Sequence, residues 1–500
     1  MSIKDPLISF IVPVYKKAPE VLEKCLKSLR DMSYKRIEII VVFDGTPEDV
    51  ELTAIAKKYT PTDKILEIEH GGAPKARNAG AKLAIGAYLS FWDADCYAKP
   101  EMAKRWMDEF KSTGADFVYS GYEFAGHQQG VDGEPFDAYL LTCNNFIATM
   151  FPMRREIFPG FDETLKAGQD WDLWLSVTRA GARGSFIEGY GFITEPPSAD
   201  SISGREWNDA KFRETHWRVR EKHGIPKRDI IIGSIPEKLK GLHIAKLIGA
   251  DFSKHLDFRI HDYKLAFNLG FGPDPWFERA PESCVKVQYW MPWDITALEN
   301  YGFSKSIQLL RKLEKYKLIH WVNEIVSQKR LSEMFDFLKI ESPKIVPLPS
   351  DVDEAETKLP ETYRVLLDID EAYMPFLHTI KQDLPYIPID DLNRETNPIV
   401  SIANYSVLVS FKQHPTIDEA IRRMLINGRN IISNVQAPGC GYFDMDVTMK
   451  EFKQELIRRI RDGRFLKFNQ EYADYYKKQV DPQAFAEKIN ALLPQEIKNG

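Results

Sequence analysis

The chain has 500 residues, 44% of them hydrophobic and 28% charged, which is enough core material for two or three globular domains. Its formal net charge of −6 gives no overall basic field of the kind that nucleic-acid-binding proteins carry. The five cysteines form neither a disulfide framework nor a zinc-binding spacing, and no signal peptide or membrane-length apolar run is evident, so we expect a soluble, cytoplasmic protein.

Strand and helix signals alternate in the N-terminal part of the chain. Residues 7–15 (LISFIVPVY) and 36–45 (RIEIIVVFDG) are short apolar runs rich in β-branched residues, as in buried strands. Between them, residues 18–32 place their apolar side chains on one helical face. Further strand signals follow at 64–70 and 87–95. This alternation predicts an α/β fold, with a parallel sheet that carries helices on both faces.

Two aspartates one residue apart, Asp93 and Asp95, end the last of these strands. Alternate carboxylates of an extended segment can converge on one divalent cation. The same spacing occurs four more times in the chain, so the spacing by itself does not decide. In parallel sheets, however, ligands bind beyond the carboxyl ends of the strands, where Tyr15 and Asp44 also stand. The sequence therefore predicts a ligand-binding edge that includes the aspartate pair.

From about residue 231 the alternation of strand and helix signals resumes. The strand candidates are 284–290, 318–323, 344–349, 363–370, 405–411 and 430–435. The best-defined helix lies within 414–430, where Thr416 and Glu419 can form a capping box and Gly428 ends the helix. Glycines and prolines between 224 and 236 mark a boundary, so we expect two α/β domains, residues 1–230 and 231–500.

Five motifs in the first domain occur in the order found in the family 2 glycosyltransferases, which have the GT-A fold. They are FIVPVY (10–15), VVFDGT (41–46), GGAPKARNAG (71–80), FWDADCYAKP (91–100) and GQDWDLWL (168–175). The resemblance implies an inverting enzyme that moves a hexosyl or N-acetylhexosaminyl group from a nucleotide diphosphate donor, a UDP-sugar, to an acceptor hydroxyl. A glycan or another cell-surface polymer is the acceptor that such enzymes commonly use.

The resemblance also implies a donor site made of residues from these motifs. Pro13, Val14 and Tyr15 would form a wall for the nucleobase, with the Tyr15 ring presenting a face to it. Asp44 would accept a hydrogen bond from a ring N–H of the base, which favours uracil. Gly72 would let the backbone approach the donor closely, because it has no side chain.

The remaining site residues follow from the same resemblance. Arg77 would hold ribose or phosphate oxygens, Asp93 would contact the ribose and the metal, and Asp95 would ligate the metal directly. Mn²⁺ or Mg²⁺ would stabilise the charge that accumulates on the diphosphate leaving group. Asp170 would be the base that takes the proton of the acceptor hydroxyl. Asp172, two residues on, is expected to point elsewhere on its helix, as a charge favoured by the helix dipole.

Three positions depart from the family pattern. Gln169 stands where the family commonly has an acidic residue, and Ser176 stands where an arginine often follows. Ser198 stands where many relatives supply a histidine that completes the metal shell. The third metal ligand therefore stays open, with His216 and His223 as further candidates.

These departures leave room for a catalytically silent binding or scaffold protein on the same fold. A glycosyltransferase acting on nucleic acid is a further alternative, suggested by the basic cluster at residues 205–228, although the acidic net charge disfavours such a partner. Residues 407–434 resemble the donor-binding half of GT-B glycosyltransferases. We therefore expect 231–500 to be a Rossmann-like domain for acceptor binding or assembly, or else to carry a second active site. The sugar, the acceptor and the oligomeric state stay undefined by the sequence.

Overall fold

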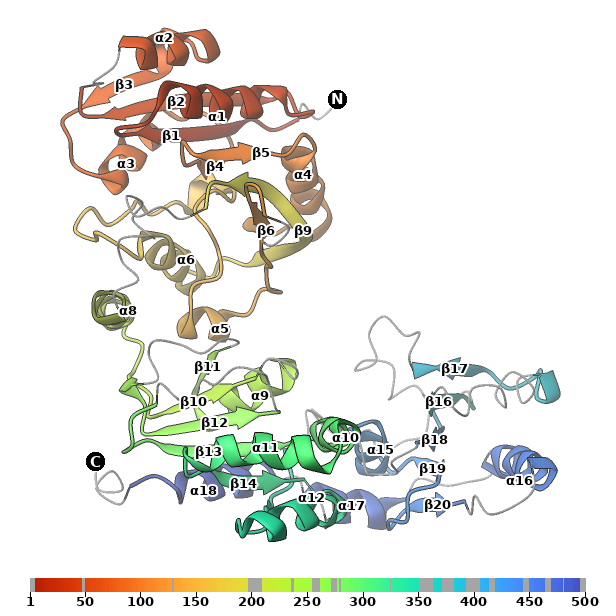
Figure 1. Ribbon diagram of the computed structural model, residues 1–500. Helices are drawn as coiled ribbons and strands as arrows, with labels where there is room; N and C mark the ends of the chain where they lie inside the picture. The colour runs from red at the N-terminus through yellow and green to blue at the C-terminus, as the bar shows by residue number, and fades with distance from the viewer. Residues whose placement is uncertain are drawn as a thin grey trace. The chain divides into compact units, whose positions relative to one another are not determined.

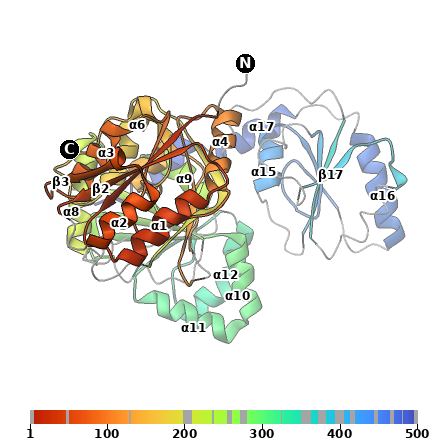
Figure 2. The ribbon, with the colours of Figure 1, turned by 90° about the horizontal axis from the view of Figure 1, so that it is seen from above.

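The computed structural model of the chain divides into two compact units, Met1–Lys227 and Arg228–Gly500, and each is described by itself (Figures 1 and 2). The described residues are 5–46, 50–127, 130–196, 209–234, 238–253, 261–270, 277, 280–323, 325–349, 363–370, 382–392, 405–412, 419–443, 449–463, 469–479 and 481–494.

In the first unit, the described strands form one mixed sheet in the order β3-β2-β1-β4-β8-β6-β9-β5, with β7 paired to β6. They are β1 (Ile8–Val14), β2 (Ile37–Asp44), β3 (Ile65–Ile68), β4 (Tyr88–Phe91), β5 (Cys96–Ala98), β6 (Phe117–Phe124), β7 (Gly130–Val131), β8 (Met153–Arg154) and β9 (Gly184–Thr194). β1 to β4 are parallel, as predicted, but β8 lies antiparallel to β4 and β6. The sheet is therefore mixed beyond β4. An antiparallel strand such as β8 can join a sheet without the helical crossover that a parallel strand needs.

The helices of this unit are α1 (Pro19–Asp31), α2 (Val50–Tyr59), α3 (Ala73–Leu83), α4 (Met102–Thr113), α5 (Ala138–Cys143), α6 (Gln169–Arg179) and α8 (Asp209–Lys222). Every residue of β1 except Pro13 is buried, as expected for a central parallel strand that is covered on both faces. Helix α3 packs directly on this part of the sheet, because Gly80 brings its backbone close to Ile11 of β1 and Val42 of β2.

The second unit contains two parallel sheets where the sequence predicted one Rossmann-like domain. The order is β11-β10-β12-β13-β14-β15 in the first and β17-β16-β18-β19-β20 in the second. The strands are β10 (Ile230–Gly233), β11 (Asp251–Ser253), β12 (Leu265–Leu269), β13 (Val285–Trp290), β14 (Ile319–Val322), β15 (Lys344–Ile345), β16 (Val365–Ile369), β17 (Ile389–Asp391), β18 (Val407–Phe411), β19 (Asn430–Ser433) and β20 (Cys440–Tyr442). Each predicted strand is present, but a pattern of apolar runs does not reveal which strands pair with which.

The helices of the second unit are α9 (Lys238–Ile248), α10 (Pro292–Tyr301), α11 (Phe303–Glu314), α12 (Ile325–Leu338), α15 (Glu419–Ile426), α16 (Met449–Asp462), α17 (Gln470–Gln479) and α18 (Pro482–Asn490). Helices α15 and α17 cover one face of the five-stranded sheet and α16 covers the other (Figure 2). The chain then returns to the six-stranded sheet, where Phe485 of α18 packs edge-on against Phe267 and Trp321.

The best-defined predicted helix is confirmed in its main part as α15, and Gly428 follows it with a φ of 61°. Its proposed capping residue, Thr416, lies outside the described residues. Within the described part of the chain, no helix is both long enough and apolar enough to cross a membrane.

The close approach of α3 to the sheet predicts a defined stability defect. A Cβ atom at Gly80 would lie 2.4 Å from Cγ2 of Ile11 and 3.0 Å from Cγ2 of Val42. We expect Gly80→Val to reduce the free energy of unfolding by about 1–3 kcal/mol through overpacking, measured as a lower midpoint of urea unfolding. Lys82→Val, on the exposed side of the same helix, is the matched control. Equal midpoints for the two variants would contradict the packing shown here.

Candidate active site

Predicted site residues of the first, second and fourth motifs gather at one edge of the N-terminal sheet. Strands β1, β2 and β4 run parallel in register, so their carboxyl ends, near Tyr15, Asp44 and Asp93, reach the same edge. Figure 1 shows these three strands side by side, with α3 next to them. The structure thus brings segments together that are separated by up to about eighty residues.

A buried arginine connects two of the predicted motifs with the acidic motif. Arg77, in α3, donates through Nη2 to Oδ1 of Asp93 at 2.7 Å and through Nη1 to Oε1 of Gln169 at 3.1 Å. The Arg77 side chain is 8% exposed and Asp93 37% exposed, so the guanidinium holds a carboxylate whose other side is open to solvent. Gln169 accepts this hydrogen bond as the commoner carboxylate could, and its amide also donates to the Leu165 carbonyl. Gln169 can therefore bind Arg77 although it lacks the negative charge of the acidic residue common in the family.

Asp95 has a different cation beside it. Lys17, which follows β1, donates to Oδ2 of Asp95, and both side chains keep about a third of their surface exposed. Sequence reasoning missed Lys17, which is the second residue after the first motif, in the stretch YKKAP (15–19).

Asp44 organises the loop that leads into α3. Its Oδ1 accepts the Gly71 N–H at 2.7 Å, and its Oδ2 accepts the Gly72 N–H at 2.9 Å and lies 3.0 Å from Nδ1 of His70. Gly72 has a φ of 88°, in the region that favours glycine, so the chain turns sharply before the helix. A carboxylate offers about four acceptor positions, and the Asp44 side chain, which is 3% exposed, uses three of them for these contacts.

Tyr15 lies beside this loop. Its ring is 46% exposed and stacks on the His70 ring, with centroids 4.2 Å apart and planes inclined by 14°. His70 was not anticipated from the sequence. Val14 is 2% exposed and Pro13 is half-buried, so of the three residues predicted to form the nucleobase wall Tyr15 has the most accessible surface.

Asp170, the predicted base, stands in the first turn of α6 beside Asn145. The Asn145 amide donates to its Oδ2 at 2.7 Å, and the Trp171 N–H donates to its Oδ1 at 2.9 Å. Surrounding atoms remove water from the carboxylate, and this desolvation raises its pKa above the ordinary value, although the two hydrogen bonds and the nearby charge of Arg77 oppose the shift. A raised pKa is typical of a carboxylate that exchanges protons with a substrate.

Asp172 lies on another side of α6, as predicted, but its role is an internal ion pair. Its carboxylate is 3% exposed and contacts Nε2 of His223 and Nζ of Lys222, both at 2.8 Å. His216 stacks on Trp171, with ring centroids 4.7 Å apart. These two histidines, which were considered as metal ligands, thus contact residues of α6, whereas the other candidate, Ser198, lies outside the described residues.

The carboxylates of Asp93 and Asp95 fit a divalent cation of the Mg²⁺ or Mn²⁺ type. Among the described residues, no group of three or more His, Cys, Asp or Glu side chains is arranged around a possible ion. Mg²⁺ is commonly held by only one or two carboxylates, with substrate phosphates and water completing its shell. The two partly exposed aspartates provide this kind of incomplete oxygen set.

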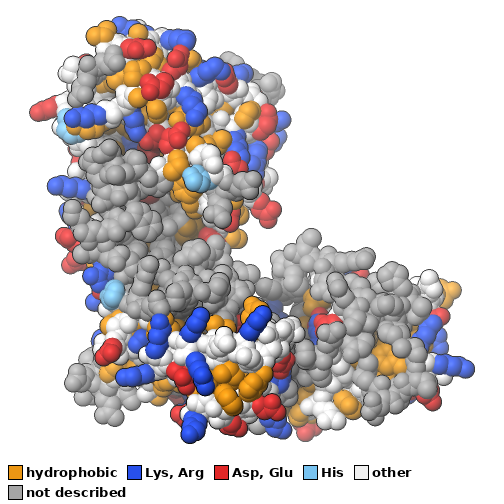
Figure 3. All heavy atoms as spheres, in the orientation of Figure 1, with side chains coloured by type: hydrophobic (Ala, Val, Ile, Leu, Met, Phe, Trp, Pro, Cys, Tyr) orange, Lys and Arg blue, Asp and Glu red, His pale blue; other side chains and the backbone are white. Residues whose placement is uncertain are grey.

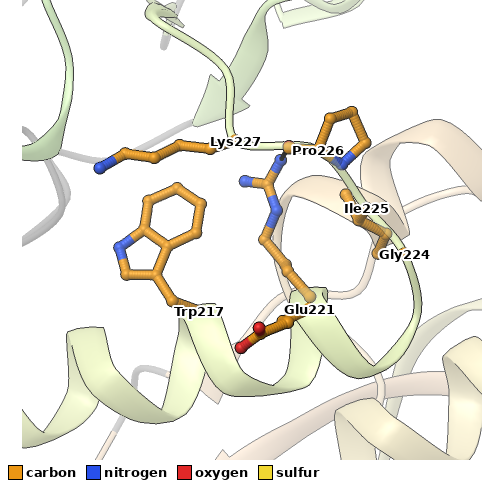
Figure 4. A pocket seen from close by; sticks show the side chains of 7 residues that line it. Trp217, Glu221, Gly224, Ile225, Pro226 and Lys227 are labelled. Carbon is orange, nitrogen blue, oxygen red and sulfur yellow. Dashed lines mark hydrogen bonds between the residues drawn. The ribbon is translucent and has the colours of Figure 1, made fainter.

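A pocket of about 490 Å³ lies elsewhere in the first unit, around the end of α8 (Figure 4). The Lys227 side chain extends over the Trp217 ring, with Nζ 5.3 Å from the ring centroid. The Arg220 guanidinium lies 4.9 Å from the same centroid. These residues belong to the basic cluster noted in the sequence, and none of them is a predicted donor-site residue.

The chain was compared with known protein families, curated proteins and solved structures. Residues 9–158 match the family model described as glycosyl transferase family 2. The N-terminal unit is similar to family 2 glycosyltransferases, as its motifs predicted. The sequence predicted an α/β fold with a GT-A domain followed by one Rossmann-like domain. The α/β class and the GT-A-like N-terminal sheet are confirmed, and the second unit contains two parallel sheets.

Two curated relatives illustrate the extent of the similarity. The uncharacterized glycosyltransferase EpsJ of Bacillus subtilis (strain 168) is 30% identical over 222 residues, 39% of this chain and 62% of EpsJ. The glycosyltransferase AglE of Haloferax volcanii is 30% identical over 138 residues, 27% of this chain and 45% of AglE. The chain therefore spans less than two thirds of the length of either relative.

A solved structure of S. aureus TarS, residues 1–349 in complex with UDP-GlcNAc, is 19% identical with a TM-score of 0.37. The match covers 43% of this chain and 66% of that one.

The two aspartates of α6 should respond oppositely when their charge is removed. Asp172→Asn takes a charged partner from Lys222 and the buried His223, so we expect the free energy of unfolding to fall by about 1–3 kcal/mol. Asp170→Asn should leave stability at pH 7 unchanged or higher, because a carboxylate whose folded-state pKa is raised disfavours the folded state once it is ionised. Thermal unfolding of both variants checks this. A larger loss for Asp170→Asn would show that the two environments are misassigned.

Proposed function

We propose that the chain is a metal-dependent inverting glycosyltransferase that transfers a sugar from a UDP-sugar to an acceptor hydroxyl. The observation that carries the proposal is the bridge from Arg77 to Asp93 and Gln169, because it connects the Asp93 carboxylate with the acidic motif that holds Asp170. The glycosyltransferase names of the curated relatives and the family match in residues 9–158 support the same reaction class.

The donor would bind along the carboxyl edge of the sheet. The exposed part of the Tyr15 ring offers a stacking surface for the base, and the remaining acceptor position of Asp44 suits the single ring N–H of uracil. Gly72 keeps the loop backbone clear of side-chain atoms where the donor passes. Arg77 orients Asp93 toward the ribose and, together with it, borders the diphosphate.

The diphosphate leaves as the glycosidic bond breaks, and negative charge grows on its oxygens. A divalent cation bound to Asp93 and Asp95 would supply Lewis-acid stabilisation of that charge. Asp170 would remove the proton of the acceptor hydroxyl as its oxygen attacks the anomeric carbon, and Asn145 would hold the carboxylate in position. Direct attack of this kind inverts the anomeric carbon.

We assign only the chemical class of the transferred sugar and of the acceptor. A hexosyl or N-acetylhexosaminyl group and a glycan or other hydroxyl polymer are proposed from the resemblance. We propose that residues 228–500, which contain two further parallel sheets, serve acceptor binding or assembly. The basic cluster at residues 205–228 is the sequence feature that suggests a nucleic-acid acceptor, and the net charge of −6 disfavours such a partner. On the coloured part of the first unit's face in Figure 3, basic and acidic side chains are interspersed.

Removing the metal-binding carboxylate should abolish the reaction while the fold persists. We expect Asp95→Ala to lose sugar transfer and Mn²⁺-dependent donor hydrolysis across a panel of nucleotide sugars, because the diphosphate charge is no longer neutralised. The matched control is Asp108→Ala, an exposed aspartate of α4. Full activity of Asp95→Ala in the presence of a chelator would contradict the metal assignment, and an absence of hydrolysis by the wild type with every donor would favour the silent binding protein.

Asp170→Asn should separate binding from chemistry. We expect nearly unchanged donor affinity and a kcat lower by about 10²–10⁴, since only proton removal is lost. Unaltered turnover would assign the base to another residue.

The raised pKa of Asp170 gives the same assignment a pH signature. In the wild type, kcat/KM should fall with decreasing pH on a limb that lies above the ordinary range of aspartate, because the base must be ionised. Asn145→Ala should move this limb to still higher pH, since the lost hydrogen bond had stabilised the ionised form. An acid limb that does not move in Asn145→Ala would contradict the positioning role.

A further inference from the structure

The two aspartates of the Asp-Ala-Asp motif have separate counter-ions of different character. Arg77 is nearly buried and is held by Gln169 as well as by Asp93. Lys17, in contrast, is about one third exposed and reaches Asp95 on a flexible side chain. The Arg77 contact is therefore built into the fold, whereas Lys17 can exchange its partner.

The backbone beside Lys17 adopts an uncommon conformation. Lys16 has a φ of 46°, in the left-handed region that residues with a Cβ atom rarely enter. This residue turns the chain between the end of β1 and the start of α1, and the turn places Lys17 next to Asp95. Backbone strain of this kind is often kept at functional sites, where the surrounding structure maintains it.

The contact between Lys17 and Asp95 affects how Asp95 can bind a metal ion. A divalent cation on the Asp95 carboxylate would stand beside the Lys17 ammonium, and like charges at such short range repel. The ammonium must therefore leave when the cation arrives. The Lys17 ammonium can then bind the donor diphosphate, whose oxygens accept strong hydrogen bonds from ammonium groups.

We propose that Lys17 is an exchangeable counter-ion that couples metal binding to donor binding, an inference that rests on the proposed function. In the ligand-free enzyme it neutralises Asp95 and competes with the divalent cation. When the cation takes the carboxylate, Lys17 moves to the diphosphate and stabilises it. Each ligand then favours the other, and metal binding without donor is weakened.

The test uses the full chain and measures binding, with no need for turnover. Isothermal titration with MnCl₂ alone, and with UDP, GDP or ADP in saturating Mn²⁺, is carried out on the wild type and Lys17→Met. We expect Lys17→Met to bind Mn²⁺ alone about fivefold more tightly, because the competing charge is gone. We expect it to bind the preferred nucleotide about tenfold more weakly, because a charge-assisted hydrogen bond is lost.

Two further variants separate charge from shape and from general surface effects. Lys17→Arg keeps the positive charge, so its Mn²⁺ affinity should stay near that of the wild type. Lys24→Met removes a nearby lysine of α1, which pairs with Glu195 at 3.5 Å, and should change neither titration.

The opposite directions of the two shifts are what a purely structural role of Lys17 would not produce. If the wild type binds Mn²⁺ and a nucleotide but Lys17→Met matches it in both titrations, or weakens both, the exchange is wrong and the proposed function stands. If the wild type binds neither Mn²⁺ nor any of the nucleotides, the proposed function fails and this inference fails with it.

Discussion

The need to pair a buried positive charge organises the candidate site. Arg77 lies in α3 with little access to water, and an unpaired guanidinium there would be strongly unfavourable. Its partners, Asp93 after β4 and Gln169 at the start of α6, come from distant parts of the chain. Because a single side chain satisfies both, the strand end and the start of α6 are held at a fixed distance. Asp170, the next residue after Gln169, is positioned by the same contact.

The carboxyl edge of the sheet shows how loops become ordered without regular structure of their own. Residues that follow a strand have backbone N–H groups without acceptors in the sheet. The Asp44 carboxylate accepts those of Gly71 and Gly72. The same carboxylate contacts His70, whose ring supports Tyr15 from one side. One buried aspartate therefore shapes the loop and the aromatic surface together.

The first turn of α6 separates two identical side chains. Residues two positions apart on a helix point in directions about 200° apart, so Asp170 and Asp172 meet different surroundings. Asp172 turns toward the end of α8, where its carboxylate pairs with the Lys222 ammonium and lies 2.8 Å from Nε2 of His223. Among the described residues, Asp170 has hydrogen-bond donors but no ion-pair partner, and desolvation raises its pKa. A structural and a chemical role can thus arise from one short motif.

The sequence by itself determined about half of the described strands, β1 to β4, β13 to β16, β18 and β19, as well as the ordered motifs and the identity of the strand-end carboxylates. These features are local: buried parallel strands are continuous apolar runs, and the motifs are short segments with fixed internal spacing. β5 to β12, β17 and β20 were not predicted. Six of them, β5, β7, β8, β11, β17 and β20, have only two or three residues, and the longer β6 and β9 mix glycines and polar residues with apolar ones, so they form no continuous apolar run. The division of the second unit into two sheets depends on strand pairing, which apolar runs do not specify.

Only the tertiary structure decided which side chains meet. Lys17 and Asp95 are 78 residues apart, Asp172 and His223 are 51 apart, and Asn145 and Asp170 are 25 apart. Each pair joins two elements that become neighbours only when the sheet and its helices pack. The chemistry of Asp95 and Asp170 depends on these partners, because a carboxylate's charge, pKa and orientation are set by the groups around it in space and not by its neighbours along the chain.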